Sequence, residues 1–150
     1  MRLAMARARE GIRRGQTPFG AVIVKNGRVV ACEHNVVWRT RDITAHAEVH
    51  AIRQACRKLR TVDLSGTTLY STCEPCPMCF SASHWARIGR IVYGATIADA
   101  RRAGFHELEI AAGTLKSLGK SPVNITRGFL RAENVRLFTH WQANPRHRVY

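Results

Sequence analysis

Two short stretches decide the fold of this chain: His46-Ala47-Glu48, and further along Pro75-Cys76-Pro77-Met78-Cys79. One histidine and a Cys-x-x-Cys pair supply three metal ligands of the kind that zinc prefers. A purely structural zinc site is closed by four protein ligands, whereas three ligands leave a position open for water. Glu48, two residues from His46, is then free to handle protons. The pattern predicts a catalytic zinc site with ligands His46, Cys76 and Cys79 and with Glu48 as the acid and base.

Both stretches are expected at helix starts. Val49, Ile52 and Cys56 form an apolar stripe that predicts a helix over 45–59, entered through Thr44 as a cap. Pro77 favours the start of another helix, over 77–86. The N–H groups at a helix start stabilise a thiolate, which is the form of cysteine that binds metal. A first turn that carries both cysteines therefore suits a metal site.

The remaining segments predict a mixed sheet. A basic helix over 2–14 precedes two apolar strands, over 19–24 and 29–32, that flank the hairpin signal Asn26-Gly27. Strands over 67–72 and 90–93 enclose the 77–86 helix, which implies a parallel pair with a right-handed crossover. A loop with a short helix is expected over 94–119, a fifth strand over 122–126 and a last helix over 130–142. We therefore expect a single α/β domain over 1–150, a three-layer α/β/α fold around a mixed, about five-stranded sheet.

Composition sets broader limits. The chain has 150 residues, of which 45% are hydrophobic, and this suits one compact core. No apolar run reaches the roughly 18–20 residues that span a bilayer, so we expect no membrane association and a cytoplasmic location. Five cysteines, an odd number, favour reduced thiols. The net charge of +14 invites polyanion binding, but the basic residues are spread along the chain and decide little alone.

Several residues near the motif also have plain structural explanations. Cys73 completes a run of cysteines similar to that of iron–sulfur proteins, but no further cysteine has suitable spacing, and we expect a buried thiol at a strand end. His50 lies one helical turn after His46, and the His-Ala-Glu context favours His46 as the ligand. Trp85 is equally consistent with core packing and with stacking on a base. Asn35 is either a turn residue or an amide that binds a base edge.

The pattern His-x-Glu with Pro-Cys-x-x-Cys resembles that of the zinc-dependent nucleobase deaminases, the cytidine/deoxycytidylate deaminase superfamily. Within it, the chain is most similar to the bacterial guanine deaminases. The resemblance is carried by Pro18-Phe19-Gly20-Ala21, Asn35, Tyr70-Ser71-Thr72-Cys73-Glu74, Trp85-Ala86-Arg87, the stretch 99–105 and Tyr150.

This resemblance implies hydrolysis of guanine to xanthine and ammonia by a zinc-activated water, with Glu48 as the proton shuttle. It also implies a homodimer in which the tail, about 141–150, is swapped to the partner subunit. The family has aspartate where this chain has Glu107, which leaves guanosine and other 2-amino purines or triazines open as substrates. The implied substrate-binding residues are Asn35, Ala47, Phe19, Trp85, Glu107 and Tyr150.

Three other functions stay open. The tRNA adenosine deaminases share the zinc core, resemble this chain over 87–95 and would explain the net charge of +14, although Phe19, the 100–105 segment and the tail differ from their pattern. Cytosine or cytidine is a third substrate class. A zinc-stabilised nucleic-acid-binding module is the non-enzymatic alternative, but it requires a fourth protein ligand and leaves Glu48 without a function.

Overall fold

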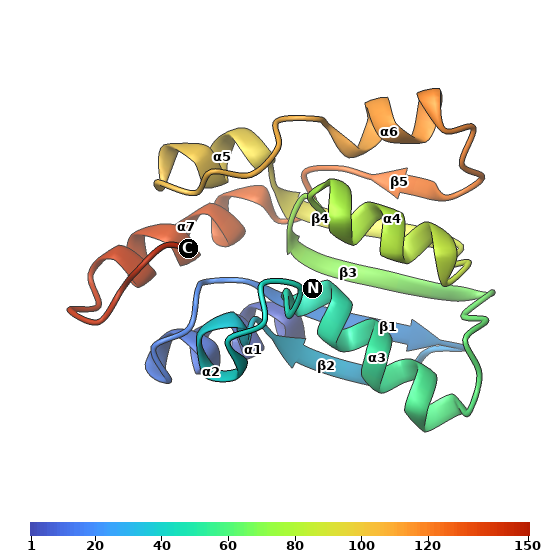
Figure 1. Cartoon of the computed structure of the whole chain (residues 1–150), viewed down its shortest axis with the longest axis horizontal. Helices are drawn as coiled ribbons and strands as arrows, with labels where there is room; N and C mark the ends of the chain where they lie inside the picture. Colours follow the sequence, from blue (N-terminus) through green and yellow to red (C-terminus); the bar gives the residue numbers. More distant parts are fainter.

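A computed structural model describes all residues, 1–150, and shows a five-stranded sheet with helices packed against it (Figure 1). The strand order is β2-β1-β3-β4-β5. Strand β1 pairs antiparallel with β2 and β3, whereas β3, β4 and β5 run parallel. The α/β class and the mixed sheet are confirmed. The strands are β1 (Gly20–Lys25), β2 (Arg28–His34), β3 (Thr67–Cys73), β4 (Arg90–Ala95) and β5 (Asn124–Thr126).

Helices cover both faces of the sheet. Helix α4 (Pro77–Trp85) contacts both α3 (Ala47–Leu59) and α6 (Ala112–Leu118) in one layer, and α1 (Arg2–Arg13) and α7 (Arg131–Gln142) form the other. Neighbouring strand residues point to opposite faces. A Cβ atom on Gly20 would lie 2.2 Å from a carbonyl oxygen of α1, and one on Gly94 would lie 2.0 Å from the Asn134 amide of α7. Glycine at both positions lets α1 and α7 approach the sheet closely.

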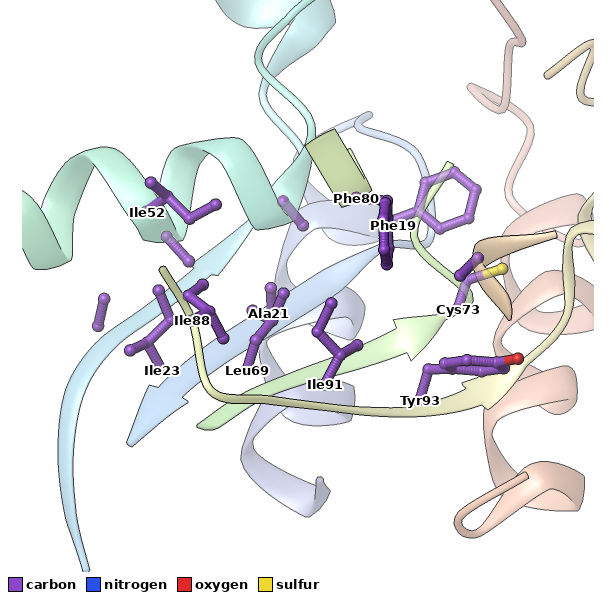
Figure 2. Close-up of a cluster of buried hydrophobic side chains, with 14 of the residues drawn as sticks. Phe19, Ala21, Ile23, Ile52, Leu69, Cys73, Phe80, Ile88, Ile91 and Tyr93 are labelled. Carbon is purple, nitrogen blue, oxygen red and sulfur yellow. The ribbon is translucent and has the colours of Figure 1, made fainter. Parts of the chain in front are cut away.

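The main core lies between the sheet and α3 and α4 (Figure 2). Ile23, Leu69 and Ile91 come from three neighbouring strands and are fully buried. Ile52 of α3 and Phe80 of α4 pack into the same cluster. Because each helix is anchored close to its start, this core holds both helix N-termini at the end of β3. The site described below lies at this edge of the sheet.

Most expected elements are present, and the main differences concern the helices. The Asn26-Gly27 turn is confirmed, with φ of 50° and 73°, as the common two-residue hairpin requires. The helix expected from residue 45 begins at Ala47, and the Thr44 cap was wrong. The N–H and hydroxyl groups of Thr44 both donate to Asp42 Oδ1, at 2.8 and 2.6 Å, so a local turn uses this side chain instead.

The segment expected as a loop with one short helix holds two, α5 (Ile97–Arg102) and α6. A four-residue helix, α2 (Val37–Thr40), was also not expected from the sequence. Helix α5 begins with a capping box in which Thr96 and Asp99 bond to each other's backbone N–H groups. None of the helices combines the length and the apolar character that a membrane crossing requires.

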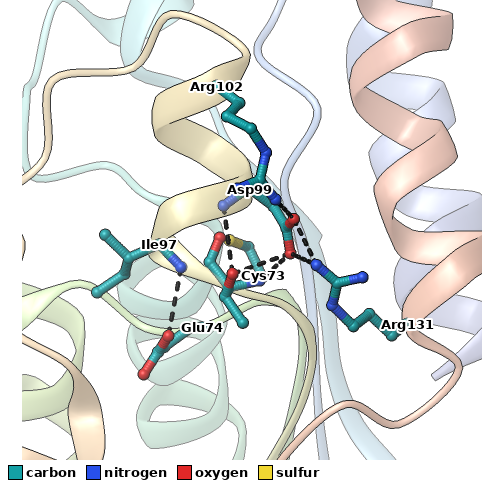
Figure 3. Close-up of polar contacts among 7 residues, drawn as sticks. Cys73, Glu74, Ile97, Asp99, Arg102 and Arg131 are labelled. Carbon is teal, nitrogen blue, oxygen red and sulfur yellow. Dashed lines mark hydrogen bonds and ion pairs between the residues drawn. The ribbon is translucent and has the colours of Figure 1, made fainter.

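The buried Asp99 carboxylate ties α5 to α7 (Figure 3). It accepts hydrogen bonds from Arg131 at 2.6 and 2.8 Å and also pairs with Arg102. Burial alone would raise the pKa of Asp99, but the Thr96 N–H and hydroxyl donors and the two arginines outweigh it and lower the pKa from 3.8. The charged carboxylate therefore stabilises the folded chain above pH 3.8, and this stabilisation is lost as the pH falls through the lowered pKa.

We expect Asp99→Asn to lower the free energy of unfolding by about 1–3 kcal/mol at pH 7, because hydrogen bonds to a charged group are lost. Denaturant unfolding of both proteins between pH 7 and pH 3 measures this difference. It should stay constant down to about pH 5 and shrink below the ordinary carboxyl pKa, as protonation removes the same charge from the wild type. A difference that does not change across this range would contradict the assignment.

Candidate active site

Three metal-ligand side chains meet where α3 and α4 begin. His46 is the N-cap residue of α3 and Cys76 that of α4, with Cys79 one turn further on. The His46 Nδ1 atom lies 3.7 Å from Cys76 Sγ and 3.6 Å from Cys79 Sγ. Zinc bonds of about 2.0–2.3 Å in a tetrahedron place ligand atoms roughly 3.3–3.8 Å apart. The spacing of the three atoms therefore fits a zinc ion.

The donor chemistry agrees with this geometry. A hydrogen bond from the Cys79 thiol and the nearby His46 ring lower the pKa of Cys76 to about 4, so its sulfur is a thiolate at neutral pH. Pro77 occupies the first turn of α4, as the sequence predicted, and its missing N–H costs that turn no hydrogen bond. Two sulfur ligands and one imidazole leave the fourth tetrahedral position to water.

Glu48 lies beside the metal ligands and is almost fully buried. Its Oε1 accepts a hydrogen bond from the Ser71 hydroxyl at 2.8 Å, and its Oε2 lies 3.5 Å from Cys79 Sγ. Burial raises the pKa of Glu48 above its ordinary range. One oxygen is thus held by β3 while the other faces the site. This geometry suits a group that takes up a proton and passes it on.

A cavity of about 510 Å³ opens beside the triad and is large enough for a nucleobase. One wall carries His46 and Cys76, and another is the segment after α5, which carries Phe105 and Glu107. Burial, followed by the charge of the Cys76 sulfur, raises the pKa of Glu107 to about 8. Its Oε2 atom is buried without a hydrogen-bond partner. The full lining is Ile43, His46, Cys76, Pro77, Met78, Phe105, His106, Glu107, Leu108 and Tyr150.

Comparison with known proteins agrees with this site. The sequence profile of the cytidine and deoxycytidylate deaminase zinc-binding region matches residues 1–95. The chain belongs to this family. His46, Cys76 and Cys79 are therefore its zinc-binding triad, and the chain is a zinc-dependent deaminase.

Two groups of relatives are similar to this deaminase. The guanine deaminase of Bacillus subtilis is 47% identical over 108 residues, which are 71% of this chain and 69% of that protein. The tRNA-specific adenosine deaminase of Agrobacterium fabrum is 47% identical over 95 residues, 63% of this chain and 62% of that protein, or just under two thirds of its length. A solved structure of a guanine deaminase from Nitrosomonas europaea has a TM-score of 0.86 at 29% identity and covers 93% of this chain and 81% of that one.

Asn35 and Tyr150 of the deaminase meet although they lie at distant points of the sequence. The Asn35 Oδ1 atom accepts from the Val37 N–H at 3.1 Å, which orients the amide. Its Nδ2 donates to the Tyr150 hydroxyl at 2.8 Å, and the phenol ring stands 5.6 Å from the His46 ring. The Tyr150 side chain lines the cavity, with Asn35 directly behind its hydroxyl. The structure therefore brings these two predicted residues together.

The tail that carries Tyr150 packs against its own chain. Asn144 Nδ2 donates to the Ile12 carbonyl at 2.9 Å, and Arg146 donates to the Arg13 carbonyl at 3.0 Å, which caps the end of α1. The Arg148 guanidinium lies over the Trp38 ring, 4.0 Å from its centroid. The same contacts would serve a tail from a second copy, so the swapped homodimer stays a prediction that the mass of the protein in solution tests.

Other predicted substrate residues lie further from the cavity. Trp85 is 84% exposed at the far end of α4, where it borders a different hollow together with Val62, so within this chain it neither packs in the core nor lines the cavity. Phe19 packs edge-on against Phe105, at 4.9 Å between ring centroids, and supports the cavity wall from behind. Ala47 is fully buried next to His46, and its N–H is one of the donors in the first turn of α3 that lack an intrahelical acceptor.

Sequence reasoning missed several site residues. Ser71, which holds Glu48, left one signal, a polar residue in a buried strand that leads to the cysteines. Met78 stands between the two cysteine ligands, and its helical position turns it toward the cavity. Ile43, His106 and Leu108 left no signal, because they lie in irregular segments that only the folded chain places at the cavity.

Proposed function

We propose that this chain hydrolyses guanine to xanthine and ammonia. The observation that carries the proposal is Glu107, whose carboxyl group lies in the cavity beside the zinc-binding triad with a buried oxygen that has no partner. A buried polar atom without a partner is costly, so its presence in a cavity points to a ligand that supplies the missing hydrogen bond.

The chemistry of the base favours guanine over adenine for this carboxyl group. Guanine carries adjacent N–H donors, on the ring nitrogen N1 and on the 2-amino group, where neutral adenine has a ring acceptor at N1. Two effects favour the ionised form of Glu107 when the base is bound: zinc on the triad balances the Cys76 charge that helps to raise this pKa, and N–H donors stabilise a carboxylate. A carboxylate offers acceptors only, and so complements a donor edge. Asn35 lies behind Tyr150, where its amide accepts from the Val37 N–H and donates to the Tyr150 hydroxyl, and so it supports this side of the cavity. Apolar walls contributed by Phe105, Met78 and Leu108 suit the faces of a flat ring.

The proposed reaction divides between the metal and this chain's own residues. When bound by the triad, zinc activates a water for attack at neutral pH. Glu48 takes one proton from the attacking water and donates it to the ring nitrogen next to the reacting carbon. It then takes the second proton from the hydroxyl group added to that carbon and passes it to the amine, which leaves as ammonia while the carbonyl of xanthine forms. Ser71 holds the Glu48 carboxyl group in place through these transfers. Tyr150 covers the cavity beside His46 and limits the access of other water.

Adenosine in tRNA is the second candidate substrate. It is supported by the tRNA-specific adenosine deaminase of Agrobacterium fabrum, which is 47% identical to this chain over its matched residues. The guanine deaminase of Bacillus subtilis has the same identity to this chain. The net charge of +14 also suits a phosphate backbone. Against it stands Glu107 in the cavity, because a carboxylate there meets no ring N–H donor on adenine.

Ammonia release by the zinc-loaded protein tests the proposal, with guanine, guanosine, adenine, cytosine and a tRNA anticodon stem-loop as substrates. We expect turnover of guanine. We expect Glu107→Gln to lower kcat/KM for guanine by roughly 10–100-fold, because hydrogen bonds to a charged group are worth about 1.5–3 kcal/mol. Zinc content should not change.

Glu109→Gln is the matched control, since Glu109 lies two residues further on and pairs with Arg101 at the surface. Its kcat/KM should equal that of the wild type. Turnover of the stem-loop without turnover of guanine or guanosine would reject guanine and support the tRNA assignment.

A further inference from the structure

One wall of the cavity beside the zinc-binding triad is an irregular segment. Residues 103–111 connect α5 to α6 without a helix or strand of their own, and they carry Phe105 and Glu107. Both flanking helices are short, α5 with 6 residues and α6 with 7. Short helices are marginal by themselves, so the position of this wall depends on what fixes its two ends.

One buried carboxyl group bonds to both ends. Glu74 Oε2 accepts a hydrogen bond from the N–H of Ile97 at 3.3 Å, and Oε1 accepts one from the N–H of Ala112 at 3.0 Å. Ile97 is the first residue of α5 and Ala112 the first residue of α6. Figure 3 shows Glu74 reaching the start of α5. The Tyr93 hydroxyl donates to Oε1 as a third partner, at 3.1 Å.

The charge of Glu74 is matched by these donors. No lysine, arginine or histidine forms an ion pair with Glu74, although its side chain is buried. A helix N-terminus presents unpaired N–H groups and a partial positive charge, and here two N-termini converge on one carboxylate. Replacement of this one carboxyl group therefore weakens both anchors of the segment at the same time.

Glu74 also belongs to the strand end that leads to the metal. Its own N–H donates to the Ala95 carbonyl at 2.8 Å, and the chain continues through Pro75 to Cys76. Glu74, which anchors the 103–111 wall of the cavity, is thus two positions from the zinc ligand Cys76. Such an arrangement sets the distance between the triad and Glu107 by a short, rigid path.

We propose that Glu74 is a positioning residue for Glu107, holding the 97–112 segment so that the Glu107 carboxyl group faces the cavity beside the zinc-binding triad. The inference rests on the proposed function, in which Glu107 binds the donor edge of guanine. Glu74 does not touch the substrate. Its effect on guanine turnover passes through Glu107.

A double-mutant cycle tests this coupling. In the wild-type background, Glu74→Gln should lower kcat/KM for guanine about tenfold, mainly through KM, with zinc content unchanged. In the Glu107→Gln background, the same substitution should cost less than about twofold, because the group that it positions is already altered. An equal loss in both backgrounds would overturn the proposal, since a general structural defect acts independently of Glu107.

Amide hydrogen exchange gives a readout that does not need turnover. Glu74→Gln should speed exchange over 97–112 and leave α3 unchanged, and equal exchange in the two proteins would overturn the proposal. A wild-type protein that deaminates no guanine rejects the proposed function, while the exchange result still decides whether Glu74 holds the segment. Should Glu74→Gln fail to fold, Tyr93→Phe removes one of the three donors and permits the same cycle with a smaller effect.

Discussion

Glu48→Gln is expected to retain zinc and to lose about 100- to 10,000-fold in kcat, the usual contribution of a general acid and base. The substitution keeps the size of the side chain, and its amide oxygen can still accept the hydrogen bond from Ser71. A neutral amide can neither take a proton from water nor return it to the leaving group. The metal ligands are unchanged, so an effect on zinc binding can be distinguished from an effect on turnover. Steady-state ammonia release and zinc analysis of the same preparation give both quantities.

Ser71→Ala is the companion variant for this experiment. It removes the hydroxyl that holds Glu48 Oε1 but leaves the carboxyl group itself in place. The loss in kcat should therefore be clearly smaller than that of Glu48→Gln. Wild-type turnover by Glu48→Gln would exclude Glu48 as the proton shuttle, and loss of zinc from this variant would show that the carboxyl group supports the metal instead.

The second large effect is expected from the metal ligands. Cys79→Ala removes one of only three protein ligands, and the remaining pair should bind zinc more than about 100-fold more weakly, a larger loss than removal of an outer-shell partner causes. Guanine turnover should become undetectable. The apparent stability should also fall, because bound zinc stabilises the folded state by mass action. Zinc content after gel filtration and the thermal unfolding midpoint, with and without a chelator, measure these effects.

Cys73→Ala is the matched control for Cys79→Ala. Cys73 precedes Cys76 with the same spacing as that between Cys76 and Cys79, but its thiol points elsewhere and donates to the Thr96 carbonyl at 3.4 Å. This variant should retain zinc and most of the turnover. Loss of the metal from Cys73→Ala would show that Cys73 is a fourth zinc ligand. It would then support a structural zinc site, as in the nucleic-acid-binding alternative.

Local patterns in the sequence were sufficient for the zinc centre and the frame around it. Ligand type and spacing identify His46, Cys76 and Cys79, because few residue types bind zinc and each ligand sits at a helix start that its neighbours define. The Asn26-Gly27 turn follows from the φ values that glycine and asparagine tolerate. Glu48 is identified as the acid and base by its position two residues after His46. Each of these signals acts within a few residues of chain, which is why it can be read without coordinates.

The substrate cavity depended on the tertiary structure. Glu107 and Tyr150 were proposed only from resemblance, and it is the packing of distant segments that brings both to the cavity beside His46. Trp85 is the opposite case. Its place near the motif suggested a contact with the substrate, but within this chain its side chain is exposed at the far end of α4, away from the cavity. Glu74 could not be recognised as an anchor, because its partners at the starts of α5 and α6 are backbone N–H groups, which every sequence contains. The zinc ligands and turns can be predicted from residue types a few positions apart. The contacts between distant irregular segments, in contrast, depend on the packing of the whole core.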